Sequence, residues 1–231
     1  MLIEDRKARA MDPHHPVIAL CAEGMRAEAA GSPERAHELF RQAWETAEAA
    51  DPVDDYAACV AAHYVARHQP APRDALHWNL VCLERADRVG DERVRGFHPS
   101  LHLNLAAAYR ELDEPARARE HFARAAEHLD DVPEGPYAQW IRIAVAEGLR
   151  WSGSVPERPA EPLVARLLAE FCARGDLKAL GLVLPAYLTD LGGEDDRVRL
   201  VTALHQVHAS RWLPPDASDD VGRVIAALGA S

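Results

Sequence analysis

Apolar and small residues recur at helical spacing along nearly the whole chain. Between its prolines the sequence runs in long stretches rich in Ala, Leu, Arg and Glu, which favour helices. No stretch alternates apolar and polar residues with β-branched enrichment, the pattern typical of a strand. Many stretches open with a proline, which fits a first helical turn because the amide there has no helical bond to lose. These prolines are Pro33, Pro52, Pro72, Pro99, Pro115 and Pro136. The pattern predicts an all-α fold of about eleven helices.

Three of these stretches share one spacing of side-chain sizes. A small residue follows the proline by three positions, a larger residue comes four positions later, and another small residue three positions after that. The stretches begin at Pro33, Pro72 and Pro115. A helix with this pattern presents a small–large–small face against which a neighbouring helix can pack closely. Another apolar helical stretch precedes each copy, so the sequence predicts helical hairpins that recur about every 40 residues.

These hairpins resemble the units of bacterial tetratricopeptide repeat (TPR) proteins, although they are degenerate and longer than usual. The third unit matches the family pattern best, at Leu105, Ala106, Tyr109, Ala118, Phe122 and Ala125. The first unit shares Gly24, Ala36, Phe40 and Ala43 with that pattern. The second unit departs from it, with His63 where a small residue is expected and Asn79 where Phe is expected. The resemblance implies a right-handed α-solenoid with a C-terminal helical extension.

A break rich in Pro, Ser and Gly between Trp151 and Pro162 divides the predicted domains. We expect an N-terminal segment at 1–16, a repeat domain at 17–155 and a C-terminal helical region at 156–231. The repeat units cover about 17–51, 52–95 and 98–132, with a further helix at 136–151. Helical stretches follow near 161–174, 176–191, 194–212 and 217–229, and Pro185 is expected to kink or break the second of them. The C-terminal region would cap the solenoid or form a homodimer.

The resemblance also implies a concave groove lined by the first helix of each unit. Its positions fall on Ile18, Cys21, Ala22, Met25 and Glu28 in the first unit. The candidate ligand-binding residues among the later positions are Val60, Tyr64, Arg67, His68, Ser100, Leu103, Asn104 and Arg110. Tyr64, Arg67 and His68 lie one helical turn apart and share a face. This set can grip a carboxylate or an extended peptide. The alternative is that Arg67 and Arg110 pair with neighbouring acids on a solvated face, and for Arg110 we favour it.

His63 and Asn79 form a candidate buried polar pair, because in a TPR unit their positions face each other across the paired helices. Burying polar groups without hydrogen bonds costs free energy. We hypothesise that His63 bonds Asn79, or that both bond a water or a ligand. A hydrogen-bonded structural pair is the favoured interpretation.

Metal and cofactor chemistry is not expected from the sequence. The 12 histidines include the helical pairs His98/His102 and His205/His208, but a pair lacks the third and fourth ligands that a metal site needs. P-loop, GxSxG and strand-linked GxGxxG motifs are absent. The cysteines, Cys21, Cys59, Cys82 and Cys172, are expected as buried apolar side chains without disulfides.

Charge and composition limit the classes of partner that we expect the chain to bind. The net charge of −11 and pI near 5.5 disfavour nucleic-acid and membrane binding. The chain has no apparent secretory signal or membrane span, so we expect a cytoplasmic protein. The sequence favours a non-catalytic scaffold or adaptor that binds a protein or peptide in its groove. An enzyme or small-molecule binder built on His63, His68, Asn79 and Tyr64 is the alternative, and homo-oligomeric assembly is a second one.

Overall fold

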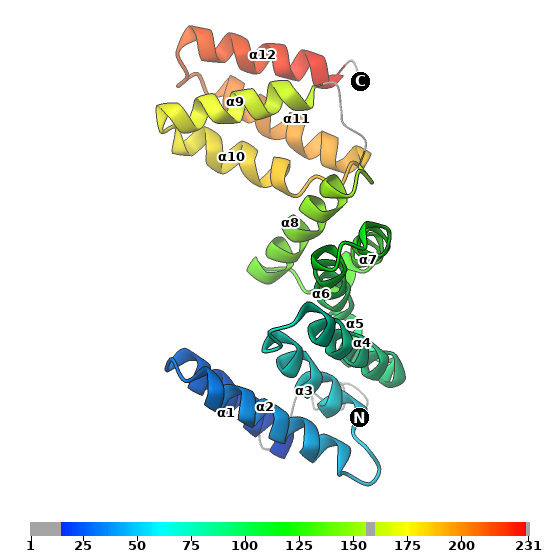
Figure 1. Cartoon of the computed structure of the whole chain (residues 1–231). Helices are drawn as coiled ribbons and strands as arrows, with labels where there is room; N and C mark the ends of the chain where they lie inside the picture. Colours follow the sequence, from blue (N-terminus) through cyan, green and yellow to red (C-terminus); the bar gives the residue numbers. More distant parts are fainter. Residues whose placement is uncertain (1–14, 156–159, 230–231) are drawn as a thin grey trace, which may run out of the picture. The chain divides into compact units, whose positions relative to one another are not determined.

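The described part of the protein is helical throughout. The computed structural model describes residues 15–155 and 160–229 (Figure 1). This part contains twelve α-helices, one short 3-10 helix and no strand, which confirms the all-α prediction. The helices are α1 (Pro16–Ala29), α2 (Pro33–Glu48), α3 (Asp55–Arg67), α4 (Pro72–Val89), α5 (Glu92–Arg95), α6 (His98–Glu111), α7 (Pro115–Glu127), η1 (Leu129–Asp131), α8 (Pro136–Trp151), α9 (Glu161–Arg174), α10 (Leu177–Leu188), α11 (Glu194–Ala209) and α12 (Pro215–Gly229).

The chain divides into two compact units. The first ends at Ile141 and the second begins at Arg142, so the division falls within α8. The sequence predicts a later boundary, in the break after Trp151, because that break is the strongest change in composition. The predicted N-terminal segment lies almost entirely outside the described residues. No helix within 15–155 or 160–229 combines the length and the apolar character that a membrane crossing requires.

Paired helices build the first unit. Helix α1 packs on α2, α3 on α4, and α6 on α7, and these are the most extensive helix–helix contacts of the unit. Neighbouring hairpins join through α2 with α3 and through α4 with α6, and α1 also lies against α3. The three hairpins therefore stack in chain order, and the first two also meet through their first helices.

Small residues allow the close approach between these helices, as the repeated pattern predicts. Ala36, Phe40 and Ala43 on α2 are fully buried. The Phe40 ring lies over Gly24 of α1, where an added Cβ atom would stand 2.4 Å from Phe40 Cε1. Phe40 also packs with Val65 of α3, so one ring connects the first hairpin to the second.

Prolines locate several helix starts correctly and one wrongly. Helices α2, α4, α7 and α8 begin at their predicted prolines, and Pro99 is the second residue of α6. Pro52, however, lies outside α3, which begins at Asp55. The Asp54 carboxylate accepts hydrogen bonds from the Tyr56 and Ala57 amides at 3.0 and 3.1 Å, and this cap sets the helix start.

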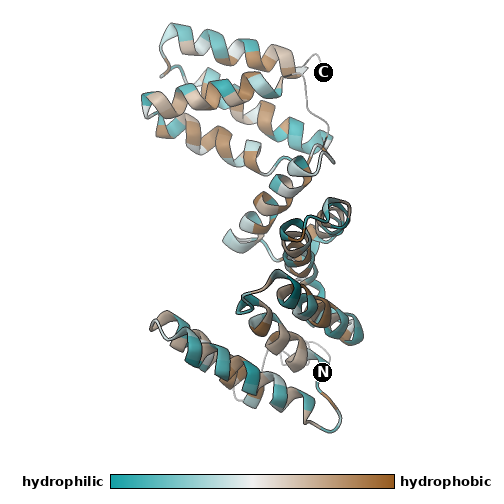
Figure 2. Cartoon of the chain, in the orientation of Figure 1, coloured by the Kyte–Doolittle hydropathy of each residue, from teal (hydrophilic) through white to brown (hydrophobic). Residues whose placement is uncertain are grey.

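The second unit has its own apolar core, formed by α9, α10, α11 and α12. Phe171, Val183, Leu204 and Leu228 are almost completely buried there. Each of these helices carries both apolar and hydrophilic residues (Figure 2). Pro185 does not end α10, which continues to Leu188. The expected break is therefore wrong: Pro185 removes one main-chain hydrogen bond from the last turn, but the helix continues through it.

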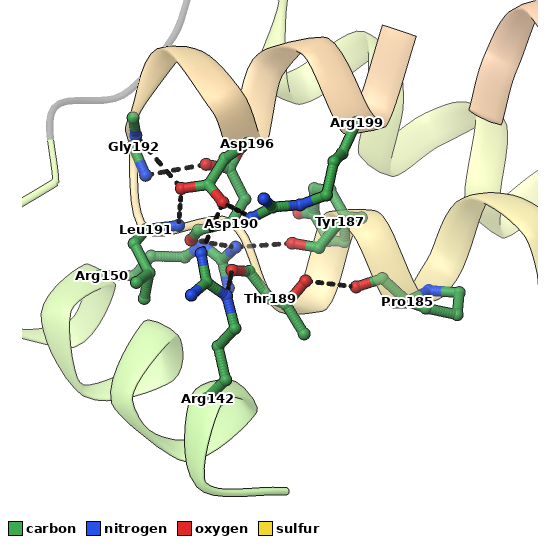
Figure 3. Close-up of polar contacts among 11 residues, drawn as sticks. Arg142, Arg150, Pro185, Tyr187, Thr189, Asp190, Leu191, Gly192, Asp196 and Arg199 are labelled. Atoms are coloured by element: carbon green, nitrogen blue, oxygen red, sulfur yellow. Dashed lines mark hydrogen bonds and ion pairs between the residues drawn. The ribbon is translucent and has the colours of Figure 1, made fainter. Parts of the chain in front are cut away.

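One buried carboxylate organises the loop between α10 and α11. Asp196, only 4% exposed, accepts hydrogen bonds from the Leu191 and Gly193 amides at 3.0 and 3.3 Å. Its other oxygen accepts a hydrogen bond of 2.7 Å from Arg142 of α8 and another from Arg199 (Figure 3). Burial by itself raises the pKa of Asp196, but the Leu191 amide and the arginines outweigh it and hold that pKa below its usual value. Asp196 is therefore ionised, and its hydrogen bonds hold the loop and the Arg142 side chain of α8 in place.

Candidate functional site

The C-terminal turn of α3 meets α1 through two polar contacts. The Tyr64 hydroxyl donates to Met25 Sδ at 3.0 Å, and Arg67 Nη2 lies 3.3 Å from Glu28 Oε1. The Arg67 guanidinium also stands over the Tyr64 ring, 5.9 Å from its centre. We call the set Met25, Glu28, Tyr64 and Arg67 the α1–α3 surface. All four occupy positions that the resemblance assigns to a groove, and packing of α1 against α3 brings them together.

Beneath this surface, aromatic rings hold Tyr64 in place. The rings of Tyr64 and Phe40 stack with centres 4.9 Å apart and planes 11° apart. The ring of His68 also packs on Phe40, with ring centres 4.9 Å apart. The His68 Nδ1 atom is 3.1 Å from the Tyr64 carbonyl oxygen, which can only accept, so Nδ1 carries the proton. His68 therefore supports the surface through packing and a main-chain hydrogen bond.

Tyr64 keeps its proton at neutral pH. Burial, together with the nearby Cys21, raises the pKa of its hydroxyl, and Arg67 opposes this only in part. The hydroxyl consequently remains a hydrogen-bond donor, either to Met25 or to a ligand group that replaces it.

Of the remaining predicted groove residues, Val60 packs beside Tyr64 against the buried cluster that contains Cys21, and those of the third hairpin do not join this set. Val60 and Asn104 are partly buried, and Leu103 is 8% exposed. The Ser100 hydroxyl donates to the Phe97 carbonyl at 2.8 Å, at the start of its own helix. Arg110 is exposed near the end of α6. The structure thus brings together the groove positions of the first two hairpins, and those of the third lie apart from them along α6.

The burial of His63 and Asn79 is close to what the sequence predicts. Asn79 is 6% exposed, and His63 is partly buried with its ring edge against Tyr64 at 5.4 Å between centres. No hydrogen bond joins these two described side chains. Burial and then Arg67 lower the pKa of His63, so its ring is neutral at pH 7. A water or ligand that bonds both side chains remains a prediction.

A second set of polar side chains lies in the third hairpin, and the sequence indicated only the His98/His102 pair within it. Four histidine rings gather there, from α6, from α7 and from the residue that follows α7: His98, His102, His121 and His128. The ring centres of His98 lie 6.2 Å from His102 and 5.2 Å from His128. Those of His102 and His121 are 5.2 Å apart, with their Nδ1 atoms 3.0 Å from each other. We call these four residues the histidine cluster.

The histidine cluster makes stability depend on pH. Burial, with His121 and His98 nearby, lowers the pKa of His102 to about 4. The unfolded chain has a histidine pKa of about 6.5. The unfolded state therefore takes up a proton that the folded state does not, so the contribution is complete above about pH 6.5 and is lost as the pH falls to 4.

We expect the free energy of unfolding to fall by up to about 1.4 kcal/mol per pH unit across this interval because of His102. The variant His102→Gln cannot take up the proton but keeps a hydrogen-bonding group for His121. Urea titrations at several pH values from 4 to 7, with a chelator present, should show a steeper pH dependence in the wild type. Parallel pH profiles for both proteins would contradict the assignment.

Comparison with known proteins provides no further assignment. No family model, curated protein or solved structure matches this chain.

Proposed function

We propose that this chain is a non-catalytic module of the tetratricopeptide type that binds a protein or peptide segment on its α1–α3 surface. The observation that carries the proposal is the convergence of Met25, Tyr64 and Arg67. Helices α1 and α3 together form one face there, which offers both polar and apolar groups. Three hairpins that stack in chain order, the first two also through their first helices, support the family and a solenoid, and the right-handed sense is part of the same proposal.

The chemistry of this surface suits an extended segment with a carboxylate beside an apolar side chain. Arg67 and Glu28 pair with 47% and 38% of their side chains exposed, and such pairs contribute at most about 1 kcal/mol. A ligand carboxylate can therefore replace Glu28 at little cost. Met25 is 41% exposed, and its flexible thioether can adapt to an apolar ligand group.

The enzymatic alternative has less support from the contacts. His68 uses Nδ1 for a main-chain carbonyl and packs its ring on Phe40. His63 packs its ring edge against Tyr64. The proposed cluster of His63, His68, Asn79 and Tyr64 thus consists largely of groups that stabilise the hairpins. Self-assembly through the C-terminal region, like a cytoplasmic location, remains a prediction from the sequence.

The proposal can be tested with peptides selected from a random library displayed on phage. The binding constant of a selected peptide would be measured by fluorescence anisotropy. Arg67→Ala should weaken it at least about 10-fold, because a charge-assisted hydrogen bond is lost. Tyr64→Ala should weaken it as well. If the ligand extends across the third hairpin, Asn104→Ala should have a smaller effect in the same direction.

Arg41→Ala is the matched control, because Arg41 is an exposed arginine that also pairs with a glutamate, Glu45 of its own helix α2. It should leave the affinity within about twofold of the wild type. Equal losses in Arg41→Ala and Arg67→Ala would count against the α1–α3 surface. Failure of the library to yield any specific peptide would count against the function itself.

A further inference from the structure

The histidine cluster has the composition of a metal site. His98, His102 and His128 each offer a ring nitrogen, and these three atoms all lie within 4.8 Å of one another. Nitrogen ligands around tetrahedral zinc lie about 3.4 Å apart, as metal–nitrogen bonds of about 2.0–2.1 Å require. Small rotations of the rings would close the remaining difference. The sequence supplied only the His98/His102 pair, and the fold adds the third nitrogen from a distant position.

Two of these rings already have a hydrogen-bond partner at Nδ1, and the partner of His128 is of the kind typical of metal-binding histidines. His128 Nδ1 is 3.1 Å from the Asp131 carboxylate, to which it can only donate, so its Nε2 remains available as a ligand. His102 Nδ1 is 3.0 Å from His121 Nδ1, and when His102 donates this hydrogen bond its Nε2 is available as well. Metal-bound histidines nearly always donate their other ring N–H to a carboxylate, a main-chain carbonyl or water, which fixes the ring orientation, and the contact of His128 with Asp131 is of this kind.

The surroundings allow an ion to enter while holding the ligands in place. His98 and His102 lie four residues apart on one face of α6. His102 is 4% exposed, whereas the side chain of His128 is 38% exposed. One side of the cluster is therefore fixed in the hairpin and the other is open to solvent. A bound ion would connect α6 to the segment that follows α7.

We propose that His98, His102 and His128 form a mononuclear site for a divalent cation of the zinc type, with water as the fourth ligand. Three imidazole nitrogens suit Zn²⁺ and its neighbours Co²⁺, Ni²⁺ and Cu²⁺, whereas Mg²⁺ and Ca²⁺ prefer oxygen ligands. Asp131 and His121 act as positioning residues, because they orient the ligands through hydrogen bonds and do not contact the ion.

The test is a calorimetric titration of the chelator-treated full chain with Zn²⁺. We expect one saturable site per chain and a higher melting temperature in the presence of the metal. His98→Ala and His128→Ala should each weaken binding by at least about 100-fold, since even second contacts contribute about 10- to 100-fold. Asp131→Asn should weaken it by about 10- to 100-fold and leave the stoichiometry unchanged. Mg²⁺ should give no saturable binding.

The ligand variants use His98 and His128 because both are partly exposed, and circular dichroism would verify that they fold. His205→Ala is the matched control, an exposed helical histidine of the other sequence pair, and it should bind Zn²⁺ as the wild type does. Absence of a saturable site would overturn the proposal. So would zinc affinity that is unchanged in both ligand variants, or that is lost equally in His205→Ala.

Discussion

Replacing Asp196 by Ala is expected to lower the free energy of unfolding of the second unit by about 3 kcal/mol. The substitution removes a carboxylate that is 4% exposed and leaves Arg142 with the Thr189 carbonyl but without a carboxylate partner, and breaking such a buried pair typically costs about 3–5 kcal/mol. The lower end applies because Arg142 retains partial contact with water. The Leu191 and Gly193 amides lose their acceptor as well.

Asp195→Ala is the matched control, because the neighbouring Asp195 is exposed in the same first turn of α11. It should cost only about 0.3–1 kcal/mol, the contribution of an acidic residue at a helix N-terminus. Urea denaturation measures both losses, and amide hydrogen exchange in α11 shows where they occur. Equal costs for the two variants would contradict the role assigned to Asp196.

The effect of Asp196 should also depend on pH in a defined direction. Its pKa lies below the usual value, so its contribution is complete above the unfolded pKa of about 3.9 and is lost as the pH falls further. The difference between wild type and Asp196→Ala should therefore shrink in acid.

The substitution Gly24→Ala should destabilise the first unit by about 1–3 kcal/mol, the usual cost of overpacking a core. The added methyl carbon would stand 2.4 to 2.8 Å from three atoms of the Phe40 ring, and Phe40 is fully buried. The ring cannot turn away without disturbing Tyr64, which stacks on it. The same substitution should therefore weaken any ligand binding on the α1–α3 surface.

The same chemical change at Gly181 is expected to stabilise the protein. Gly181 is an exposed residue within α10, and nothing lies within 4 Å of an added Cβ atom there. Alanine should stabilise that helix by about 0.5–1 kcal/mol, because glycine is the poorer helix former. Thermal melts of both variants are the measurement, and a neutral Gly24→Ala would show that the contact with Phe40 is not limiting.

Local sequence signals predicted most of the helices. Prolines at first-turn positions and apolar periodicity gave the starts of α2, α4, α7 and α8, and the expected stretch 161–174 coincides with α9. The start of α3 was missed because the helix does not open at Pro52 but begins after Asp54, whose side chain caps it. Cys172 was expected to be buried but is exposed, whereas Cys21, Cys59 and Cys82 are buried as predicted. Helical periodicity places a residue on a face but does not establish what covers that face.

The sequence predicted which candidate site residues share a face of one helix, but not the contacts that they make with other helices. Tyr64 and Arg67 share a face of α3 by spacing alone, but their contacts with Met25 and Glu28 arise from the packing of α1. His128 gave no signal in the sequence, because its approach to α6 depends on how the third hairpin closes. The partner of Arg142 was likewise invisible, since Asp196 lies far along the chain.

The most direct test of the proposed function is an amide chemical-shift map of the labelled protein with a selected peptide. The account predicts that the largest shifts fall in α1 and α3, around Met25, Tyr64 and Arg67. It also predicts that Arg67→Ala reduces them at the same peptide concentration. Shifts confined to α2, α4 and α7, or to the second unit, would contradict it.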